Sequence, residues 1–182
     1  MRMPAPTYFT AEMVRTLPED GRRYEVVHGE LLVTLAPRLW HQELVARLHL
    51  ALRSYLRTER MGHALASPAD ISWAHDTLVQ PDVFVVPIDE ARTLDWTRLR
   101  TLLLVAEVLS PSSARADRFS KRRRYQEAGV PLYWLVDGET LTVDVWTRDA
   151  EFPVIERERL VWHPTGATSA FTIELAELFR PI

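Results

Sequence analysis

The apolar run at residues 102–109 constrains the fold of this chain more than any other segment. Seven of its eight residues are Leu, Val or Ala, and the exception is Glu107. A run without alternation is typical of a strand that is covered on both faces, as in the centre of a sheet flanked by helices. We therefore expect a layered α/β fold in which residues 102–109 form a central strand.

Other segments predict the remaining elements of such a fold. His28 and Gly29 have the composition of a two-residue hairpin turn between strands at residues 24–27 and 30–35. Apolar residues at three- and four-residue intervals predict an amphipathic helix at 41–59. Further strands are expected at 64–73, 79–86, 132–136, 141–146 and 154–162, helices at 114–128 and 173–179, and a short helix or loop at 89–100.

The composition narrows the class of protein. A length of 182 residues suits one well-buried domain, and 47% hydrophobic with 26% charged residues is ordinary for a globular protein. No apolar run is long enough to cross a membrane, and the first six residues lack the apolar core of a signal peptide. The lack of cysteine excludes disulfides, a thiolate zinc site and a cysteine nucleophile. We expect a single domain over residues 1–182 and a cytoplasmic location.

Two carboxylates interrupt apolar segments, Glu107 within 102–109 and Asp82 within 79–86. A carboxylate in a buried strand costs roughly several kcal/mol unless a cation or hydrogen-bond donors compensate it. Two such groups brought together repel each other unless a hard divalent cation lies between them. We therefore consider Asp82 and Glu107 a candidate pair of metal ligands.

Lys121 is the only lysine among the 22 lysine and arginine residues. An ammonium is a compact charge that tolerates burial differently from a planar guanidinium, so a retained lysine can mark a chemical requirement, although codon bias alone also explains it. In the predicted helix, Lys121 shares one stripe with Asp117 and Tyr125, and small residues at both ends of that stripe predict close packing on the sheet. The alternative is an exposed ion pair between Asp117 and Lys121.

These residues indicate a metal-dependent phosphodiesterase site. Mg²⁺ suits oxygen ligands, with Mn²⁺ as a substitute, and none of the six histidines has the paired spacing of a zinc site. His41 is read as a residue of the helix start rather than as a base.

The order of several short motifs resembles the bacterial putative restriction endonuclease domain family of the PD-(D/E)XK nuclease superfamily. Its pieces are Tyr24-Glu25-Val26-Val27-His28-Gly29-Glu30, His41-Gln42, Pro68-Ala69-Asp70-Ile71, Gln80-Pro81-Asp82, Glu107-Val108-Leu109-Ser110-Pro111-Ser112, Asp117 to Lys121, Ala128-Gly129-Val130-Pro131 and Tyr133-Trp134-Leu135-Val136-Asp137. The resemblance covers residues 24–146, which we expect to be the core of the domain.

The resemblance implies a restriction endonuclease-like fold, a mixed β-sheet flanked by α-helices, and Mg²⁺-dependent hydrolysis of DNA. It implies that Asp82, Glu107 and Lys121 are catalytic and that Asp82 and Glu107 bind the metal with a backbone carbonyl near Val108. Glu30 and Asp70 are second-tier candidates for an outer or water-mediated metal ligand, and they fit equally well as a strand-end carboxylate and a turn residue. In the superfamily the lysine stands two residues beyond the acid. This chain has Leu109 there, so Lys121 must reach the same place from the following helix.

Two other functions fit the same residues. The chain could be a catalytically inactive binding or assembly module that keeps the fold, which Leu109 and the net charge of −3 favour. It could also hydrolyse RNA or small phosphoesters. An acidic chain binds nucleic acid only through a local basic patch, for which the candidates are Arg115, Arg118, Arg122, Arg123 and Arg124, although such a run is often a solvated helix face. Cutting both strands of a duplex requires two sites, so a homodimer is expected.

Overall fold

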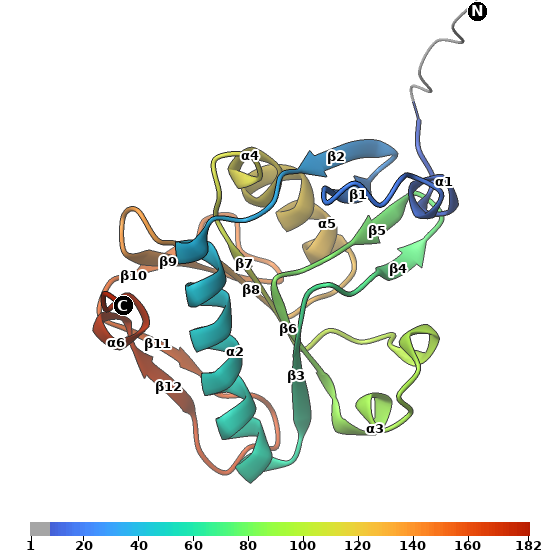
Figure 1. The fold of residues 1–182 in the computed structure, drawn as a ribbon. Coiled ribbons are helices and arrows are strands. Elements are labelled where there is room, and N and C mark those ends of the chain that lie inside the picture. The colour runs from blue at the N-terminus through green and yellow to red at the C-terminus, as the bar shows by residue number, and fades with distance from the viewer. Residues whose placement is uncertain (1–7) are drawn as a thin grey trace, which may run out of the picture.

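The computed structural model describes residues 8–182, and its largest sheet has six strands in the order β10-β9-β8-β7-β6-β3 (Figure 1). β7 and β8 pair in parallel and the other neighbours are antiparallel, so the sheet is mixed. β7 lies in the middle and all five of its residues are buried, which confirms the expected central strand. The strands are β3 (Gly62–Ala66), β6 (Val83–Pro87), β7 (Leu104–Val108), β8 (Leu132–Asp137), β9 (Thr142–Thr147) and β10 (Val154–Glu156).

Two smaller sheets complete the strand set. A four-stranded sheet has the order β2-β1-β5-β4, and β11 pairs with β12 in a two-stranded sheet. The predicted hairpin is confirmed: His28 and Gly29 both adopt positive φ, at 51° and 76°, as the two-residue turn requires. The strands are β1 (Arg23–Val27), β2 (Glu30–Thr34), β4 (Ile71–Ala74), β5 (Thr77–Val79), β11 (Arg159–Trp162) and β12 (Phe171–Glu174).

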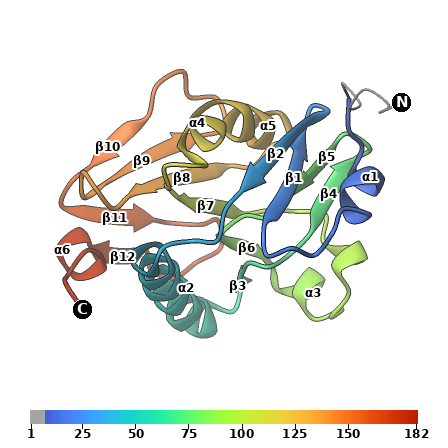
Figure 2. The ribbon, with the colours of Figure 1, turned by 45° about the horizontal axis from the view of Figure 1, so that its top comes forward.

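Helices cover both faces of the six-stranded sheet (Figures 1 and 2). The long α2 (Leu39–Glu59) packs on one face, and the segment 114–127 packs on the other. That segment consists of α4 (Ala114–Ala116), a π-helical turn η2 (Asp117–Lys121) and α5 (Arg122–Glu127). The short elements are α1 (Ala11–Arg15), α3 (Ile88–Ala91), the 3-10 turn η1 (Trp96–Arg98) and α6 (Leu175–Leu178).

Three predicted strands are wrong as single elements, because each is divided between two sheets. Residues 64–73 split into β3 and β4, and residues 79–86 split into β5 and β6. Pro68 and Pro81 lie at these breaks, where a residue without an N–H cannot continue a ladder. Residues 154–162 split into β10 and β11 at the exposed Arg157 and Glu158. The predicted helix at 173–179 begins as β12, and only 175–178 are helical.

Alternation along the central strands decides which side chains can meet. In β7, Leu104, Ala106 and Val108 pack in the core under α2, whereas Val105 packs with Tyr125 of α5 on the opposite face. Because successive side chains of a strand point to opposite faces, Glu107 faces the same way as Val105. Glu107 is therefore on the side of the sheet that η2 and α5 cover.

The same rule places Asp82, which comes just before β6. Phe84 and Val86 pack on the α5 side and Val83 packs on the α2 side, so Asp82 also faces α5. Val83 pairs with Ala106 across the antiparallel ladder, so the next step along both strands sets Asp82 opposite Glu107. The sheet thus brings together two acids that are 25 residues apart in the sequence.

Candidate active site

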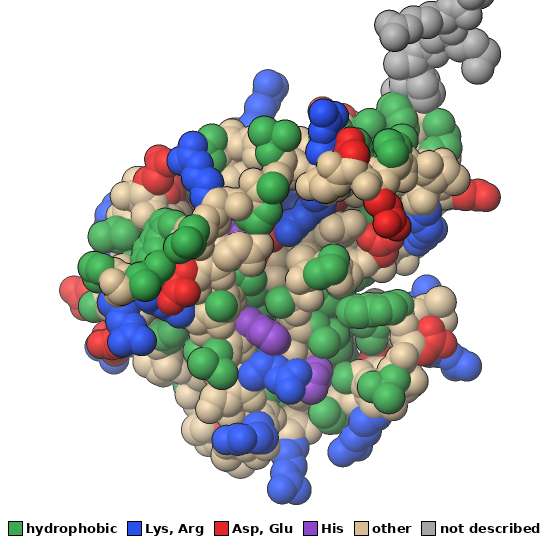
Figure 3. Space-filling view, in the orientation of Figure 1, with side chains coloured by type: hydrophobic (Ala, Val, Ile, Leu, Met, Phe, Trp, Pro, Cys, Tyr) green, Lys and Arg blue, Asp and Glu red, His purple; other side chains and the backbone are tan. Residues whose placement is uncertain are grey.

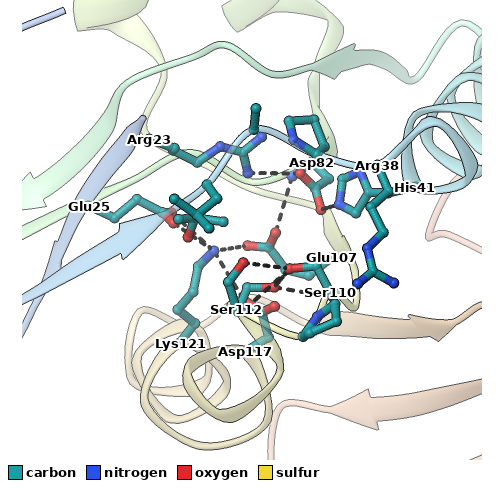
Figure 4. Close-up of a pocket in the computed structure, with 16 residues that line it drawn as sticks. Arg23, Glu25, Arg38, His41, Asp82, Glu107, Ser110, Ser112, Asp117 and Lys121 are labelled. Carbon is teal, nitrogen blue, oxygen red and sulfur yellow. Dashed lines mark hydrogen bonds and ion pairs between the residues drawn. The ribbon is translucent and has the colours of Figure 1, made fainter. Parts of the chain in front are cut away.

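A cavity of about 150 Å³ lies where β1, the start of β6, the end of β7, the start of α2 and η2 meet. Figure 4 shows acidic side chains from the strands and from η2 pointing toward one another across it. The ionisable residues that line it are Arg23, Glu25, Arg38, His41, Asp82, Glu107, Asp117 and Lys121.

Asp82 is held by three donors. Arg23 Nη1 lies 2.8 Å from Oδ1, His41 Nε2 lies 3.1 Å from Oδ2, and the backbone N–H of Val108 donates to Oδ2 at 2.9 Å. Burial alone raises the pKa of a carboxyl group. Here the hydrogen bond from His41 and the charge of Arg23 outweigh burial, so the pKa of Asp82 lies well below its usual value. Asp82 is therefore ionised at neutral pH.

Glu107 is 1% exposed and contacts a different set of donors. Lys121 Nζ lies 2.7 Å from Oε1, Tyr125 donates its hydroxyl to Oε1 at 3.1 Å, and the Asp82 N–H donates to Oε2 at 3.3 Å. Burial raises the pKa of Glu107 well above its usual value even though Lys121 opposes the shift, and the neighbouring acids add to it. The site therefore holds one carboxyl group that ionises readily and one that resists ionisation.

Lys121 is 2% exposed and lies among three carboxylates. Its Nζ is 2.7 Å from Glu107, 3.0 Å from Glu25 and 3.3 Å from Asp117. Burial lowers the pKa of an ammonium group, but the charges of Glu107, Glu25 and Asp117 outweigh it and hold the pKa of Lys121 well above its usual value. The alternative of an exposed ion pair between Asp117 and Lys121 is wrong, because both side chains are buried.

Lys121 reaches Glu107 from the helix, as the resemblance required. The position two residues beyond Glu107 is Leu109, whose side chain packs in the core on the α5 side of the sheet. The lysine therefore approaches the acid from the covering helix layer and not from its own strand.

The structure adds residues to the predicted cluster. Glu25 faces the cavity from β1, Asp117 enters it from the first turn of η2, and Arg23 and His41 hold Asp82. His41 does lie in the first turn of α2, as predicted, and it also contacts the site.

The second-tier residues are placed elsewhere. Glu30 is exposed at the start of β2 and lines a wider groove that borders the cavity at Glu25 and Lys121. Asp70 is also exposed, accepts a hydrogen bond from Gln80 Nε2 at 2.8 Å, and lines a groove on another part of the surface. Neither carboxylate lines the cavity that contains Asp82 and Glu107.

The predicted arginine patch is mostly engaged within the protein. Arg118 forms ion pairs with Asp137 and Asp144, each at 3.1 Å, and the guanidinium of Arg122 lies 4.4 Å from the ring centroid of Trp146. Arg123 and Arg124 pair with Glu127. The run 115–124 therefore acts largely as a set of structural contacts.

The donor set of the cavity suits a hard divalent cation by charge. Four carboxylates face three cations, Arg23, Arg38 and Lys121, so one negative charge remains uncompensated when every acid is ionised. Asp117 Oδ1 is buried without a hydrogen-bond partner, 3.3 Å from the lysine ammonium. Within residues 8–182, however, no three acidic or histidine side chains are already arranged around a point that could hold a metal ion. The residues fit a metal in type and charge, and binding would require their carboxylates to exchange present partners.

A mixed sheet with helices on both faces, and with two acids and a lysine meeting at its strand ends, defines a restriction endonuclease-like fold. The chain belongs to the Uma2 family, described as putative restriction endonuclease, whose model matches residues 11–176. The resemblance and the fold expected from the sequence are thereby confirmed.

A solved structure shows the same fold. The crystal structure of a putative nuclease belonging to DUF820 from Anabaena variabilis ATCC 29413 is similar with a TM-score of 0.79 and 20% sequence identity. The match covers 94% of this chain and 97% of that chain. A comparison with curated proteins gives no match. No helix within residues 8–182 is long and apolar enough to cross a membrane.

Proposed function

We propose that this protein is a Mg²⁺-dependent endonuclease that hydrolyses phosphodiester bonds in DNA. One observation carries the proposal: Lys121 Nζ lies 2.7 Å from Glu107 in a cavity that Asp82 also lines. Membership of a restriction endonuclease family supports DNA over RNA or small phosphoesters as the substrate.

Each residue of the cluster has a role that follows from its contacts. Asp82 and Glu107 would hold the metal, and bound Mg²⁺ supplies Lewis-acid activation of a phosphodiester and of water. Arg23 and His41 fix the Asp82 carboxylate in its ionised form. Lys121 orients the attacking water or stabilises negative charge that grows on the phosphoryl oxygens, which is the positioning and electrostatic role that phosphoryl transfer demands.

The mouth of the cavity suits a phosphodiester. Arg38 is exposed there, next to Ser110 and Ser112. A guanidinium fork pairs with phosphate oxygens through two parallel hydrogen bonds, so we assign Arg38 to binding the DNA backbone at the site. Cutting both strands of a duplex requires two such sites, and we propose that two copies of the chain act together.

Cleavage assays test the proposal directly. Purified protein is incubated with supercoiled and linear DNA in Mg²⁺, in Mn²⁺ or in chelator, and we expect metal-dependent nicking or cutting. Asp82→Asn and Lys121→Ala should each reduce the rate by about a hundredfold or more, because each removes a charge that acts on the transition state. Asp89→Asn is the matched control, since this carboxylate is 87% exposed and lies on α3. Undiminished cleavage by both site variants would rule the proposal out.

The alternative is a binding or assembly module without catalysis. The observation that favours it is the present pairing of the acids with Lys121, Arg23 and His41, with no preformed metal cluster in the described chain. Such a module would show no metal-dependent cleavage of any DNA form, and Glu107→Gln would leave its DNA binding unchanged.

A further inference from the structure

A basic groove with a volume of about 580 Å³ lies at the far end of α2 from the cavity. It is formed by the last turns of α2, the start of β3 and α3. Figure 3 shows arginine side chains, in blue, gathered over this end of α2 and toward α3. The arginines that line it are Arg53, Arg57, Arg60 and Arg92, and all four are exposed.

The positive charge of this groove is poorly compensated. No carboxylate is among its lining residues, and Arg53, Arg57 and Arg60 form no ion pair within residues 8–182. Glu59, which is adjacent to Arg60 in the sequence, accepts hydrogen bonds from Thr168 and Ser169 instead. In a chain whose net charge is −3, three arginines without a carboxylate partner in one groove form a local site for an anion.

His63 holds one of these arginines against the wall of the groove. Arg53 Nη1 lies 2.7 Å from His63 Nε2, which can accept its hydrogen bond only when the imidazole is neutral. Burial lowers the pKa of His63, and the charges of Arg53 and His49 lower it further. Arg53 is therefore positioned by a neutral partner and keeps its full charge for a ligand.

We infer that this groove binds the phosphate backbone of duplex DNA at a distance from the site of cleavage. The inference rests on the proposed function, which brings DNA to the other end of α2. Arginine is the residue best suited to phosphate because its planar fork pairs with two oxygens. The groove is lined by no Phe, Tyr or Trp side chain on which successive unstacked bases could lie, so a duplex fits it better than a single strand.

The length of α2 sets the geometry of this contact. His41 lines the cavity, and Arg53 and Arg60 of the groove follow it by 12 and 19 residues, which at 1.5 Å per residue is roughly 18 and 28 Å along the helix. Duplex DNA advances 3.4 Å per base pair, so this separation corresponds to about five to eight base pairs. A duplex much shorter than that cannot occupy both places at once.

Fluorescence anisotropy with labelled duplexes in chelator tests the inference without any need for cleavage. The groove variant carries Arg53→Gln, Arg57→Gln and Arg60→Asn, with Asn at position 60 because its φ of 59° is left-handed. With a duplex of roughly 24 base pairs we expect binding weaker by about tenfold or more, and a salt dependence shallower by about 0.9 for each phosphate contact removed. With a hairpin whose stem has roughly four base pairs, which is too short to reach from the cavity to the groove, we expect a much smaller loss.

Two control variants separate the groove from general charge and from misfolding. The first carries Arg148→Gln, Arg157→Gln and Arg159→Gln, three exposed arginines that do not line the groove, and removes the same charge. The second replaces Arg53, Arg57 and Arg60 with lysine, which keeps the charge. Both should bind the longer duplex within about threefold of the parent protein, because neither removes cationic contacts from the groove.

Several outcomes would overturn the inference. One is an equal loss of affinity for the longer duplex in the groove variant and in the first control. The others are unchanged binding of that duplex by the groove variant, and a loss of affinity in the groove variant that is larger for a single strand than for the duplex. The assay also separates this inference from the proposed function. Groove-dependent binding without metal-dependent cleavage would defeat only the hydrolytic proposal, whereas cleavage with unchanged binding by the groove variant would defeat only the groove.

Discussion

At the scale of single residues, the organising group is the ammonium of Lys121. Without it, Glu25, Glu107 and Asp117 would face one another across a buried space with only uncharged donors between them. Removing one partner of a buried ion pair leaves an uncompensated charge, which costs far more than the pair itself contributes. Lys121 is therefore expected to matter for stability as well as for any chemistry.

Lys121→Met keeps an unbranched side chain that is one heavy atom shorter, and it removes the charge. We expect the free energy of unfolding at neutral pH to fall by about 3–5 kcal/mol, because three buried carboxylates lose their common cation. In combination with Glu107→Gln the total loss should be smaller than the sum of the single losses by about 1–3 kcal/mol, since the lysine and this acid are in contact. Urea denaturation of the four proteins measures this coupling. Strictly additive losses would show that the 2.7 Å contact is not energetically significant.

The two acids in apolar segments and the single lysine were noticeable in the sequence, whereas Glu25 in the amphipathic strand β1 was not. Asp82 and Glu107 stand out because a charge among buried aliphatic side chains needs a reason. Glu25 lies in β1, where Arg23 and Glu25 alternate with apolar residues and resemble the solvent face of a strand. Only the tertiary structure shows that this face of β1 covers the larger sheet. Whether Asp82, Glu107 and Lys121 are catalytic remains a proposal for the cleavage assay.

At the scale of elements, the π-helical turn η2 accounts for the alignment of the helix side chains. In a regular α-helix, residues four apart drift by about 40° around the axis, so three residues spaced by four spread over a wide arc. A π turn holds more residues per turn and reduces this drift between Asp117 and Lys121. The sequence predicts the stripe from its spacing, but nothing in it predicted the π turn, which is frequent at functional sites.

Gly29 in the β1–β2 turn and Gly21 just before β1 form a matched pair for substitution. Gly29 and Gly21 both have positive φ, at 76° and 81°, so alanine strains the backbone at either position. A Cβ on Gly29 would also overlap the ring of Tyr8, whereas nothing lies within 4 Å of a Cβ on Gly21. We expect Gly29→Ala to destabilise the protein by about 1–3 kcal/mol more than Gly21→Ala, as measured by urea denaturation. Equal losses would mean that Tyr8 does not pack on the turn.

The C-terminal end of α2 is held to residues 168 and 169 by hydrogen bonds to the carboxylate of Glu59, whose protonation depends on pH. Glu59 accepts hydrogen bonds from the backbone and hydroxyl groups of Thr168 and Ser169, and the bond from the Ser169 hydroxyl is the largest cause of its lowered pKa. A lowered folded-state pKa stabilises the fold above the unfolded value, about 4.3, and this contribution is lost as the pH falls through the folded-state pKa. Glu59→Gln should therefore reduce stability at pH 7 and not at pH 2.

Urea denaturation at the two pH values measures this effect, with Glu139→Gln as the control because that side chain is exposed in the turn before β9. The control should unfold like the parent protein at both values. A loss of equal size at pH 2 and pH 7 in Glu59→Gln would assign the effect to packing and not to the ionised carboxylate.

At the scale of the whole molecule, fold and site depend on the same alternation. Successive side chains along β6 and β7 point to opposite faces of the sheet, so that aliphatic side chains are buried under α2 on one face and under α5 on the other. The same alternation makes Asp82 and Glu107 both face α5. The layered fold was predictable because the spacing of apolar residues clearly distinguishes the long helix at 41–59 from the buried strand at 102–109. The assignment of strands to sheets was not, because short apolar runs such as 64–73 do not reveal where a chain changes partners.

Metal binding should appear as a change in global stability. A ligand that binds only the folded state stabilises it by about 2.7 kcal/mol when its free concentration is 100 times its dissociation constant. For a chain of this size that corresponds to a rise in Tm of roughly 5–10 °C, which differential scanning calorimetry with increasing Mg²⁺ measures. Glu107→Gln should remove the rise, because it deletes one of two proposed ligands, and the exposed Asp89→Asn should keep it.

This titration separates the two functional readings at the level of the folded protein. An endonuclease must exchange the present partners of Asp82 and Glu107 for a cation, so its stability must depend on Mg²⁺ through Glu107. An assembly module has no such requirement, because Lys121 and Arg23 already compensate these acids. A Tm that is constant with Mg²⁺ would show that the folded protein does not bind the ion, and a rise that persists in Glu107→Gln would place the ion at another site. In either case the cluster of Asp82, Glu107 and Lys121 would have only a structural role.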